Sequence, residues 1–321
     1  MILAMLLLWL VSAILILREY RISRSILYLA IFSLFSAACF LILGSPDVAM
    51  AEAAISSFTT VFFVVCFERY LSTQSYTLRD PHPTDSQPGK PRKLKGWNLF
   101  NLFLTISIFA LFIKFIPGVE EVNSTLKYFY IHRFMGDVGG ENPVTSIYLA
   151  YRVYDTLFEA LMLVVSVVAV IHLSYFDGIS IKKGKPSEIE TSSAAGLTLR
   201  LVCPAMLVFG IYLIVNGHLS PGGGFQGGLA VASFFVCRYM IYDIYDISIS
   251  KLNKMEELIF AGITVVAALV VFQQGLVSLI PQQHILLFQN VYLITMNVLI
   301  GLKVACAFVI LFYRYIGIER Q

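Results

Sequence analysis

Long apolar segments recur along this chain and restrict it to a membrane fold. Nine such segments stand out by hydropathy, and most hold about 20 largely apolar residues, enough for a helix to cross a hydrocarbon core of ~30 Å. They lie at residues 2–17, 26–44, 48–67, 97–116, 146–173, 198–216, 226–243, 258–277 and 291–313. Only 13% of the residues are charged, whereas soluble domains have about 25%. We therefore predict an all-α integral membrane protein of about nine transmembrane helices, because a helix satisfies its own backbone hydrogen bonds in lipid.

The basic residues indicate how these helices are oriented. With the N-terminus outside, eighteen of the 23 Lys and Arg residues fall in cytoplasmic segments, and only Lys127 and Arg133 fall in an outer loop. Cytoplasmic loops carry an excess of Lys and Arg, so we predict an outside N-terminus and a cytoplasmic C-terminus. Arginines 18, 21 and 24 follow the first span, which we interpret as a retained helix rather than a signal peptide. The net charge of +3 then reflects topology, and we expect no nucleic-acid partner.

Two polar stretches divide the chain into blocks. One of them, residues 73–96, contains four prolines and has the composition of a flexible linker. We predict a three-helix block, a cytoplasmic linker, a two-helix block with a long outer loop, a second linker and a four-helix block. Their bounds are 1–72, 73–96, 97–179, 180–196 and 197–321.

The stretch NGHLSPGGGFQGG (216–228) contains the glycine spacing of a dinucleotide fingerprint. A dinucleotide site needs a strand before the glycines and a βαβ unit around them, but this stretch joins two apolar helices. We therefore expect no nucleotide and predict a tight turn, because glycine permits positive φ and close backbone approach. The turn residues are Pro221, Gly222, Gly223 and Gly224. Gly227 and Gly228 should let the next helix pack closely against a neighbour.

His218 and Gln226 flank this turn. For His218 two interpretations stay open. It is a surface histidine at the membrane boundary, or it belongs with Gln226 to a proton or cation relay at the mouth of a path.

Charged residues within apolar helices are costly, and they usually face the protein interior or a water-filled path. Asp47 opens the third span and fits either a helix cap or an ion-path residue. Glu52 lies further in, where a cap does not explain it. We interpret Glu52 as part of a proton or cation path, with a structural pair to a neighbouring helix as the alternative.

The fifth span carries Arg152, Asp155 and Glu159 at a spacing that places them on one helical face. Arg152 and Asp155 can pair with each other, while Glu159 should lie near mid-membrane and need a partner elsewhere. Lys303 lies midway along the last span, and we expect it to pair with Glu52, with Glu159 or with an acid on another subunit. All four are candidate ion-path residues, and a purely structural ion cluster is the alternative.

The sequence gives no sign of a catalytic or metal centre. The five cysteines all fall in apolar spans and form no C-x-x-C pair, which argues against a disulfide framework, a zinc site or an iron–sulfur cluster. No HExxH or GxSxG motif occurs. We expect no cofactor, no catalytic centre within this chain, and no metal other than sodium in transit.

Several of these motifs resemble one protein family. GIYLIVNGHLSPGGGFQGGLAVAS (210–233) and NVLIGLKVACAFVILF (297–312) resemble the B subunit of Mrp-type multisubunit sodium/proton antiporters. GSPDVAMAEAAISS (44–57) resembles a motif of a small membrane subunit of energy-converting hydrogenases, and NPVTSIYLAYRVYDTLFEALML (142–163) resembles the element that follows it. Two positions depart from the usual pattern: Ala150 replaces an acid and Phe158 replaces a glycine.

The resemblance implies a membrane subunit that carries part of a proton or sodium path, assembled with other membrane subunits in the cell membrane of a prokaryote. The parent complex stays open between a plain antiporter, a membrane-bound hydrogenase and a sulfane-sulfur reductase. The alternative function is a scaffold that links pumping subunits to a redox arm without moving ions. A stand-alone transporter fits less well, because the three-block layout resembles accessory subunits.

Overall fold

The computed structural model describes residues 2–77, 103, 106–107, 124–173, 193–241, 248–277 and 286–318. The chain divides into two compact units, residues 1–74 with 133–321, and residues 75–132. In the second unit, the described part includes the start of α5 (Ser124–Val138), where the His132 ring lies 2.8 Å from the Tyr128 carbonyl. The predicted span at 97–116 lies almost wholly outside the described residues.

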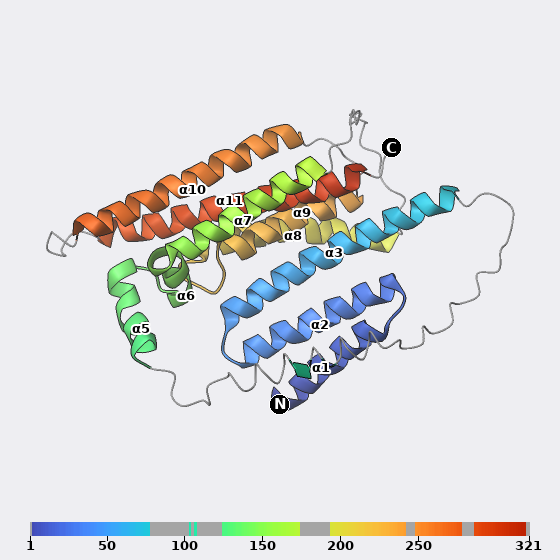
Figure 1. Cartoon of the computed structure of the whole chain (residues 1–321), viewed down its shortest axis with the longest axis horizontal. Helices are drawn as coiled ribbons and strands as arrows, with labels where there is room; N and C mark the ends of the chain where they lie inside the picture. Colours follow the sequence, from blue (N-terminus) through green and yellow to red (C-terminus); the bar gives the residue numbers. More distant parts are fainter. Residues whose placement is uncertain are drawn as a thin grey trace. The chain divides into compact units, whose positions relative to one another are not determined.

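The first unit is built of helices, and the described residues of the chain contain no strand. The all-α prediction is therefore confirmed over this part of the chain (Figure 1). Its longer helices are α1 (Ile2–Arg18), α2 (Ile22–Ile42), α3 (Pro46–Thr77), α7 (Val153–Leu173), α8 (Ser193–Asn216), α9 (Gly224–Ile241), α10 (Ile249–Val277) and α11 (Leu286–Ile318).

Six of the described helices are long and apolar enough to cross a membrane. The spans are Ile22–Ile42, Pro46–Phe67, Val153–Leu173, Gly196–Asn216, Ile249–Phe272 and Asn290–Tyr315. The apolar helix Ala4–Arg18 is shorter than these spans. Six spans support a multi-pass membrane protein, while the count of nine and the orientation of the termini stay predictions.

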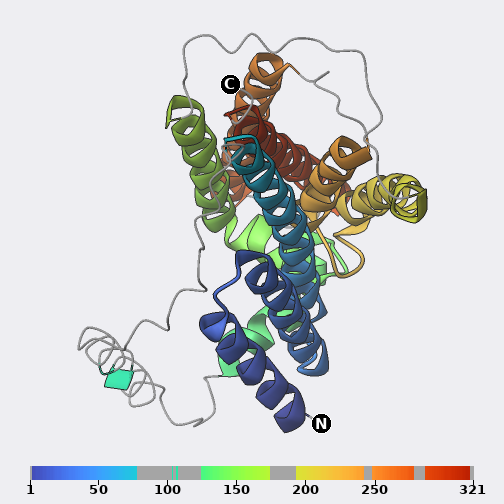
Figure 2. The same ribbon diagram turned by 90° about the vertical axis from the view of Figure 1, so that its right-hand side faces the viewer.

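Helix α11 forms the centre of the first unit. In the apolar 18-residue window of its Asn290–Tyr315 span 67% of the residues are buried, against 22% or less in the corresponding windows of the other five spans. It packs against α7, α9 and α10, and α9 also packs against α8. Figure 2 shows α11 in dark red, with α7 in green on one side and α8 and α9 in yellow and orange on the other. A charged residue on α11 is therefore held inside protein rather than in lipid.

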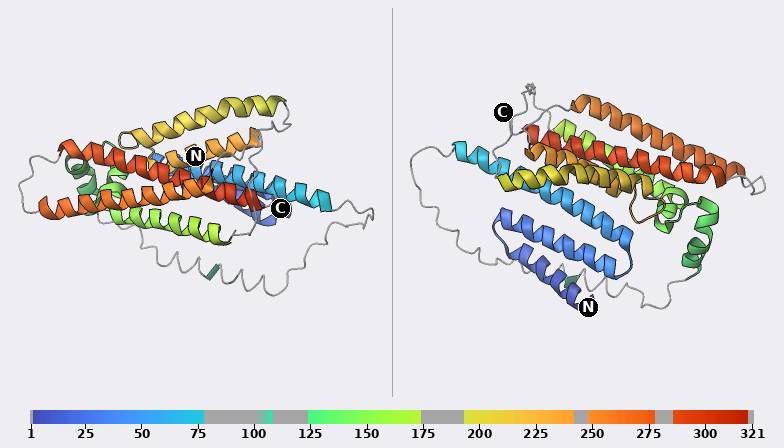
Figure 3. Two further views of the ribbon diagram at one scale, coloured as in Figure 1. Left: turned by 90° about the horizontal axis from the view of Figure 1, so that it is seen from above. Right: turned by 180° about the vertical axis from the view of Figure 1, so that it is seen from behind.

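Aromatic contacts join the N-terminal helices to this centre. Helices α1 and α2 form a hairpin (Figure 3), in which Trp9 stacks on Phe32 with ring centroids 5.0 Å apart. On α3, Phe58 meets Phe308 of α11 edge to face at 4.9 Å. Edge-to-face pairs of this kind are favourable beyond the area they bury.

The segment expected to form one helix over 146–173 is interrupted, so that prediction was wrong. Helix α6 (Pro143–Ser146) leads into the π-helix η1 (Ile147–Tyr151), and α7 begins only at Val153. Arg152 ends the π-helix with φ −120° and ψ 38°. Within the π-turn the Tyr148 carbonyl accepts from the Thr156 hydroxyl at 2.6 Å. Tyr148 belongs to this π-helix, and its hydroxyl lies beside Gly223 of the glycine turn.

The glycine turn has the geometry that its sequence predicts. Gly222 and Gly223 have φ values of 146° and 144°, which a side chain would strain. A Cβ on Gly228 would lie 2.5 Å from the Gly301 carbonyl oxygen, so α9 and α11 approach as closely as they do only because this residue is glycine. The turn thus fixes α9 tightly against the central helix.

Candidate ion-path site

The most deeply buried charges of the described chain are Lys303 and Glu256. The Lys303 ammonium donates to Glu256 Oε1, and each side chain is 1% exposed. Lys303 lies near the middle of the Asn290–Tyr315 span, and its Nζ also lies 5.4 Å from the centre of the Phe260 ring. Two unpaired charges at this depth would each cost several kcal/mol. Their pairing is what makes the site tolerable in an apolar bundle.

Glu256 is not among the partners predicted for Lys303, and that prediction was wrong. The apolar run of α10 starts at residue 258, so Glu256 looked like part of a loop, but the helix begins at Ile249. Because Lys303 and Glu256 are 47 positions apart in the sequence, no local spacing relates them. One signal in the sequence could have indicated Glu256 as a partner. Glu256 and Glu257 are adjacent at the start of an apolar run, and helix geometry lets only one of two successive side chains face the core.

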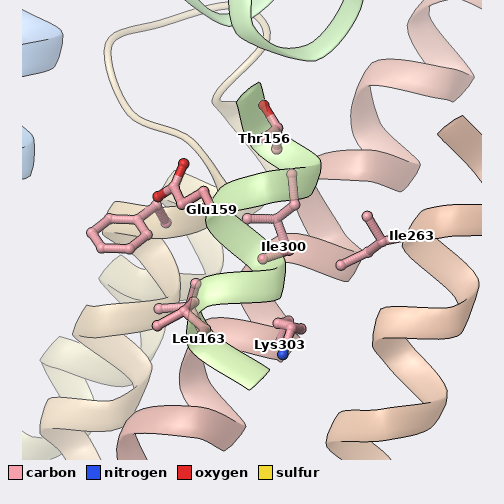
Figure 4. Close-up of a pocket in the computed structure, with 9 residues that line it drawn as sticks. Thr156, Glu159, Leu163, Ile263, Ile300 and Lys303 are labelled. Atoms are coloured by element: carbon pink, nitrogen blue, oxygen red, sulfur yellow. The ribbon is translucent and has the colours of Figure 1, made fainter. Parts of the chain in front are cut away.

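A small cavity is lined by Lys303 of this pair and by Glu159. It has a volume of about 10 Å³ and lies between α7 and α11, with walls completed by Phe225 and Ile263. We call it the α7–α11 cavity; Thr156, Glu159, Ile300 and Lys303 all line it. In Figure 4 the Glu159 carboxylate and the Lys303 ammonium share the cavity without pointing at each other.

Glu159 is the seventh residue of α7, and its side chain is exposed on the surface of the chain. Among the described residues no salt bridge reaches it. An exposed carboxylate in a membrane helix requires a neighbour other than lipid.

Arg152 and Asp155 form the ion pair that their spacing predicts. Their side chains are 63% and 56% exposed, and they lie at the start of α7, at one end of the span. Exposed pairs contribute little to stability. This pair is separate from Lys303 and Glu256 in the described structure.

Glu52 has a partner on the neighbouring helix. Its Oε1 accepts a hydrogen bond from the Ser33 hydroxyl of α2. The carboxylate is partly buried, and the bond ties α2 to α3 within their apolar spans. Glu52 thus lies on a different helix pair from Lys303.

Asp47 joins three loops at one end of the bundle. Its Oδ1 accepts from Asn142 Nδ2 at 2.8 Å and from the Gly222 backbone N–H at 3.2 Å. A simple helix cap does not describe this contact, because both donors belong to other segments. Asn142 also caps α6, since its Oδ1 accepts from the Val144 N–H at 2.9 Å.

A larger cavity opens beside these loops. It has a volume of about 420 Å³, and its lining includes Asp47, Glu141, Asn142 and Ser220. We call it the loop cavity. The loops that line it, at 44–48, 141–144 and 219–221, are all predicted to lie on the outer side, and the structure brings them together at one end of the helices.

Two further polar side chains, Tyr148 and Asn297, lie against the glycine turn, and the sequence pattern alone did not indicate them as site residues. Asn297 Oδ1 accepts from the Tyr148 hydroxyl at 3.3 Å and from the Gly224 N–H at 3.1 Å. Gln226 is close by, because its Oε1 would lie 3.2 Å from a Cβ on Gly223. Any side chain at Gly223 would also collide with the Tyr148 hydroxyl. The absence of a side chain at Gly223 makes room for Tyr148, Gln226 and Asn297.

His218 is buried, with an exposed fraction of 7%, so its interpretation as a surface histidine was wrong. Its Nδ1 lies 3.1 Å from the Val215 carbonyl oxygen. Its own carbonyl accepts from the backbone N–H groups of Glu141 and Asn142. His218 thereby fixes the start of α6 to the loop that follows α8, and Pro221 lines the same loop cavity.

Family comparisons identify two segments of the chain. Residues 195–310 match the family described as a domain related to the MnhB subunit of Na+/H+ antiporters. Residues 7–71 match the MbhD family, described as the D subunit of MBH. A Staphylococcus haemolyticus protein described as an antiporter subunit of the mnhB2 type is 33% identical over 63 residues, which cover 20% of this chain and 45% of that protein. The chain spans about half the length of the first curated relatives that it matches.

Two solved structures share the fold. The Mrp complex from Dietzia sp. DQ12-45-1b aligns with a TM-score of 0.68 and 19% identity, covering 99% of this chain and 35% of that chain. The archaeal membrane-bound sulfane sulfur reductase aligns with a TM-score of 0.53 and 23% identity, covering 68% of this chain and 96% of that chain. The chain thus combines an MbhD segment with an MnhB-related domain, which makes it a homologue of Mrp-type antiporter membrane subunits.

Proposed function

We propose that this chain is a membrane subunit of a multisubunit Mrp-type sodium/proton antiporter module and contributes part of its proton or sodium path. The observation that carries the proposal is the buried Lys303–Glu256 pair near mid-span, whose Lys303 lines the α7–α11 cavity together with Glu159. Charged groups are placed in membrane helices at a cost, and this cost is usually associated with transport of ions. The chain would work in the plasma membrane of a prokaryote, within an energy-converting respiratory complex.

The proposal also covers the organisation of the chain. Blocks 1–72, 97–179 and 197–321 would correspond to membrane subunits that are separate proteins elsewhere, joined here by the linkers 73–96 and 180–196. The matched segments 7–71 and 195–310 support the first and third of these blocks. Other membrane subunits would cover the surface of α7 that exposes Glu159.

A scaffold is the second candidate function, and the pairing of Lys303 with Glu256 inside the chain favours it. Each charge has its partner within the chain, so the pair could serve only to hold α10 against α11. A scaffold of this kind would join pumping subunits to a redox arm without passing ions. Glu159 separates the two candidates, because no ion pair in the described structure needs its charge.

The test replaces Glu159 by Gln in the intact complex, reconstituted into vesicles with a pH-sensitive dye and a sodium gradient. We expect the complex to assemble in normal amounts and sodium-dependent proton transport to fall strongly. Glu257→Gln is the matched control, since Glu257 is exposed and accepts a hydrogen bond from Asn253 on the same helix. Normal transport by the assembled Glu159→Gln complex would favour the scaffold.

A further inference from the structure

A line of polar groups leads from the loop cavity into the helix bundle. Beside that cavity, Asn142 Nδ2 donates to Asp47 and also contacts the Gly217 carbonyl at 3.4 Å. The Thr145 hydroxyl donates to the same Gly217 carbonyl at 2.6 Å and lies 3.5 Å from the Tyr148 hydroxyl. Tyr148 in turn donates to Asn297 at 3.3 Å. These contacts link an open cavity to the central helix α11.

Asn297 ends this line with an unused donor. The residue is fully buried, and both contacts to its side chain go to Oδ1. Its Nδ2 has no acceptor among the described residues. Buried amide groups almost always have hydrogen-bond partners, and water commonly supplies the missing one. We therefore infer that a water molecule accepts from Asn297 Nδ2, close to Tyr148.

Two elements join the end of this line to the α7–α11 cavity. On α11, Ile300 and Lys303 follow Asn297 and line the α7–α11 cavity. On α7, Thr156 lines the same cavity and donates to the Tyr148 carbonyl. At about 10 Å³ this cavity has room for roughly one water molecule. A sodium ion that keeps its shell of water molecules is larger than this cavity.

We propose that Thr145, Tyr148 and Asn297 form a proton-conducting file between the loop cavity and the site of Glu159, Lys303 and Glu256. This inference rests on the proposed function and narrows it: the path through this chain carries protons, and sodium passes elsewhere in the complex. Hydroxyl groups and water pass protons by exchange. At each oxygen one O–H bond forms as another breaks, so the Tyr148 hydroxyl stays neutral and needs only to rotate before the next proton. The Asn297 amide itself carries no proton and holds the water that does.

The test removes the Tyr148 hydroxyl in the intact complex. Tyr148→Phe should assemble normally and lower the rate of proton transport in vesicles about tenfold or more. Tyr292→Phe is the matched control, because it also loses a partly buried hydroxyl bond, from Tyr292 to the Leu149 carbonyl at 2.5 Å, outside the file. If Tyr148→Phe prevents assembly, Thr145→Val removes the preceding hydroxyl with little change of shape and carries the same expectation.

The outcomes separate this inference from the function on which it rests. Normal proton transport by assembled Tyr148→Phe, beside a loss of transport in Glu159→Gln, would overturn the proton file and leave the antiporter role intact. Normal transport in both variants would overturn both. Equal loss in Tyr148→Phe and Tyr292→Phe would also count against the file, because it would trace the effect to packing around the π-helix.

Discussion

Breaking the Lys303–Glu256 pair should destabilise the protein more than replacing it. In Lys303→Met or Glu256→Met alone, one charge stays buried without its partner. Both side chains are 1% exposed, so water cannot compensate, and removal of one partner of such a pair costs about 3–5 kcal/mol. This is a large part of the ~5–15 kcal/mol that usually stabilises a folded protein. Each single variant should therefore lose most of the assembled complex.

The double variant Lys303→Met, Glu256→Met removes both charges at once. Methionine has nearly the length of either side chain and adapts to irregular space, and a buried ion pair replaced by apolar residues is often neutral for stability or better. We therefore expect the double variant to regain stability relative to both single variants. The coupling free energy between the two positions should therefore be larger than the loss of stability in either single variant, because the side chains are in direct contact.

The assay is the temperature at which the purified complex loses its native-gel band, with Glu257→Gln as control. Glu257 differs from Glu256 by one position and faces outward, so its replacement should leave this temperature unchanged. A single variant that loses its band at the same temperature as the wild type would contradict this expectation. So would a double variant that loses its band at a temperature no higher than that of the single variants.

Two further outcomes follow from the contacts of the remaining charges, and a third follows from the distribution of the basic residues. Glu52→Gln keeps an oxygen that can accept from Ser33, so the complex should assemble and lose transport if Glu52 is part of the path; full transport in native-like vesicles would exclude it. Asp47→Asn should reduce transport less than Glu52→Gln, because an amide oxygen still accepts from Asn142 or Gly222; an equal or greater loss would contradict this ranking. A cysteine placed within residues 80–92 should react only with reagent added from the cytoplasmic side, and labelling from outside would refute the predicted orientation.

The sequence predicted the features that local chemistry determines. Apolar runs predicted the six spans found among the described residues, glycines predicted the tight turn, and the spacing of Arg152 and Asp155 predicted their ion pair. Each of these depends on residues within a few positions of one another. The tight fit at Gly228 was also predictable, because a glycine within a membrane helix usually marks close approach.

The candidate site depends on contacts between distant segments, which one sequence does not reveal. Glu256 meets Lys303 only because α10 packs along α11, and hydropathy placed Glu256 outside the span. Tyr148 reaches Asn297 because a π-helix interrupts an otherwise regular pattern. A π-turn is rare, and helical periodicity does not predict it; here the Thr156 hydroxyl donates to the Tyr148 carbonyl within it.

Ion transport by the doubly apolar variant tests the central claim most directly. The intact complex with Lys303→Met and Glu256→Met is purified, its assembly is verified on a native gel, and sodium-dependent proton movement is measured in sealed vesicles beside the wild type. We predict an assembled complex whose transport is strongly reduced, because the buried charges of the path are gone while the packing is kept. Transport at the wild-type rate by this assembled complex would contradict the account and leave the chain a scaffold.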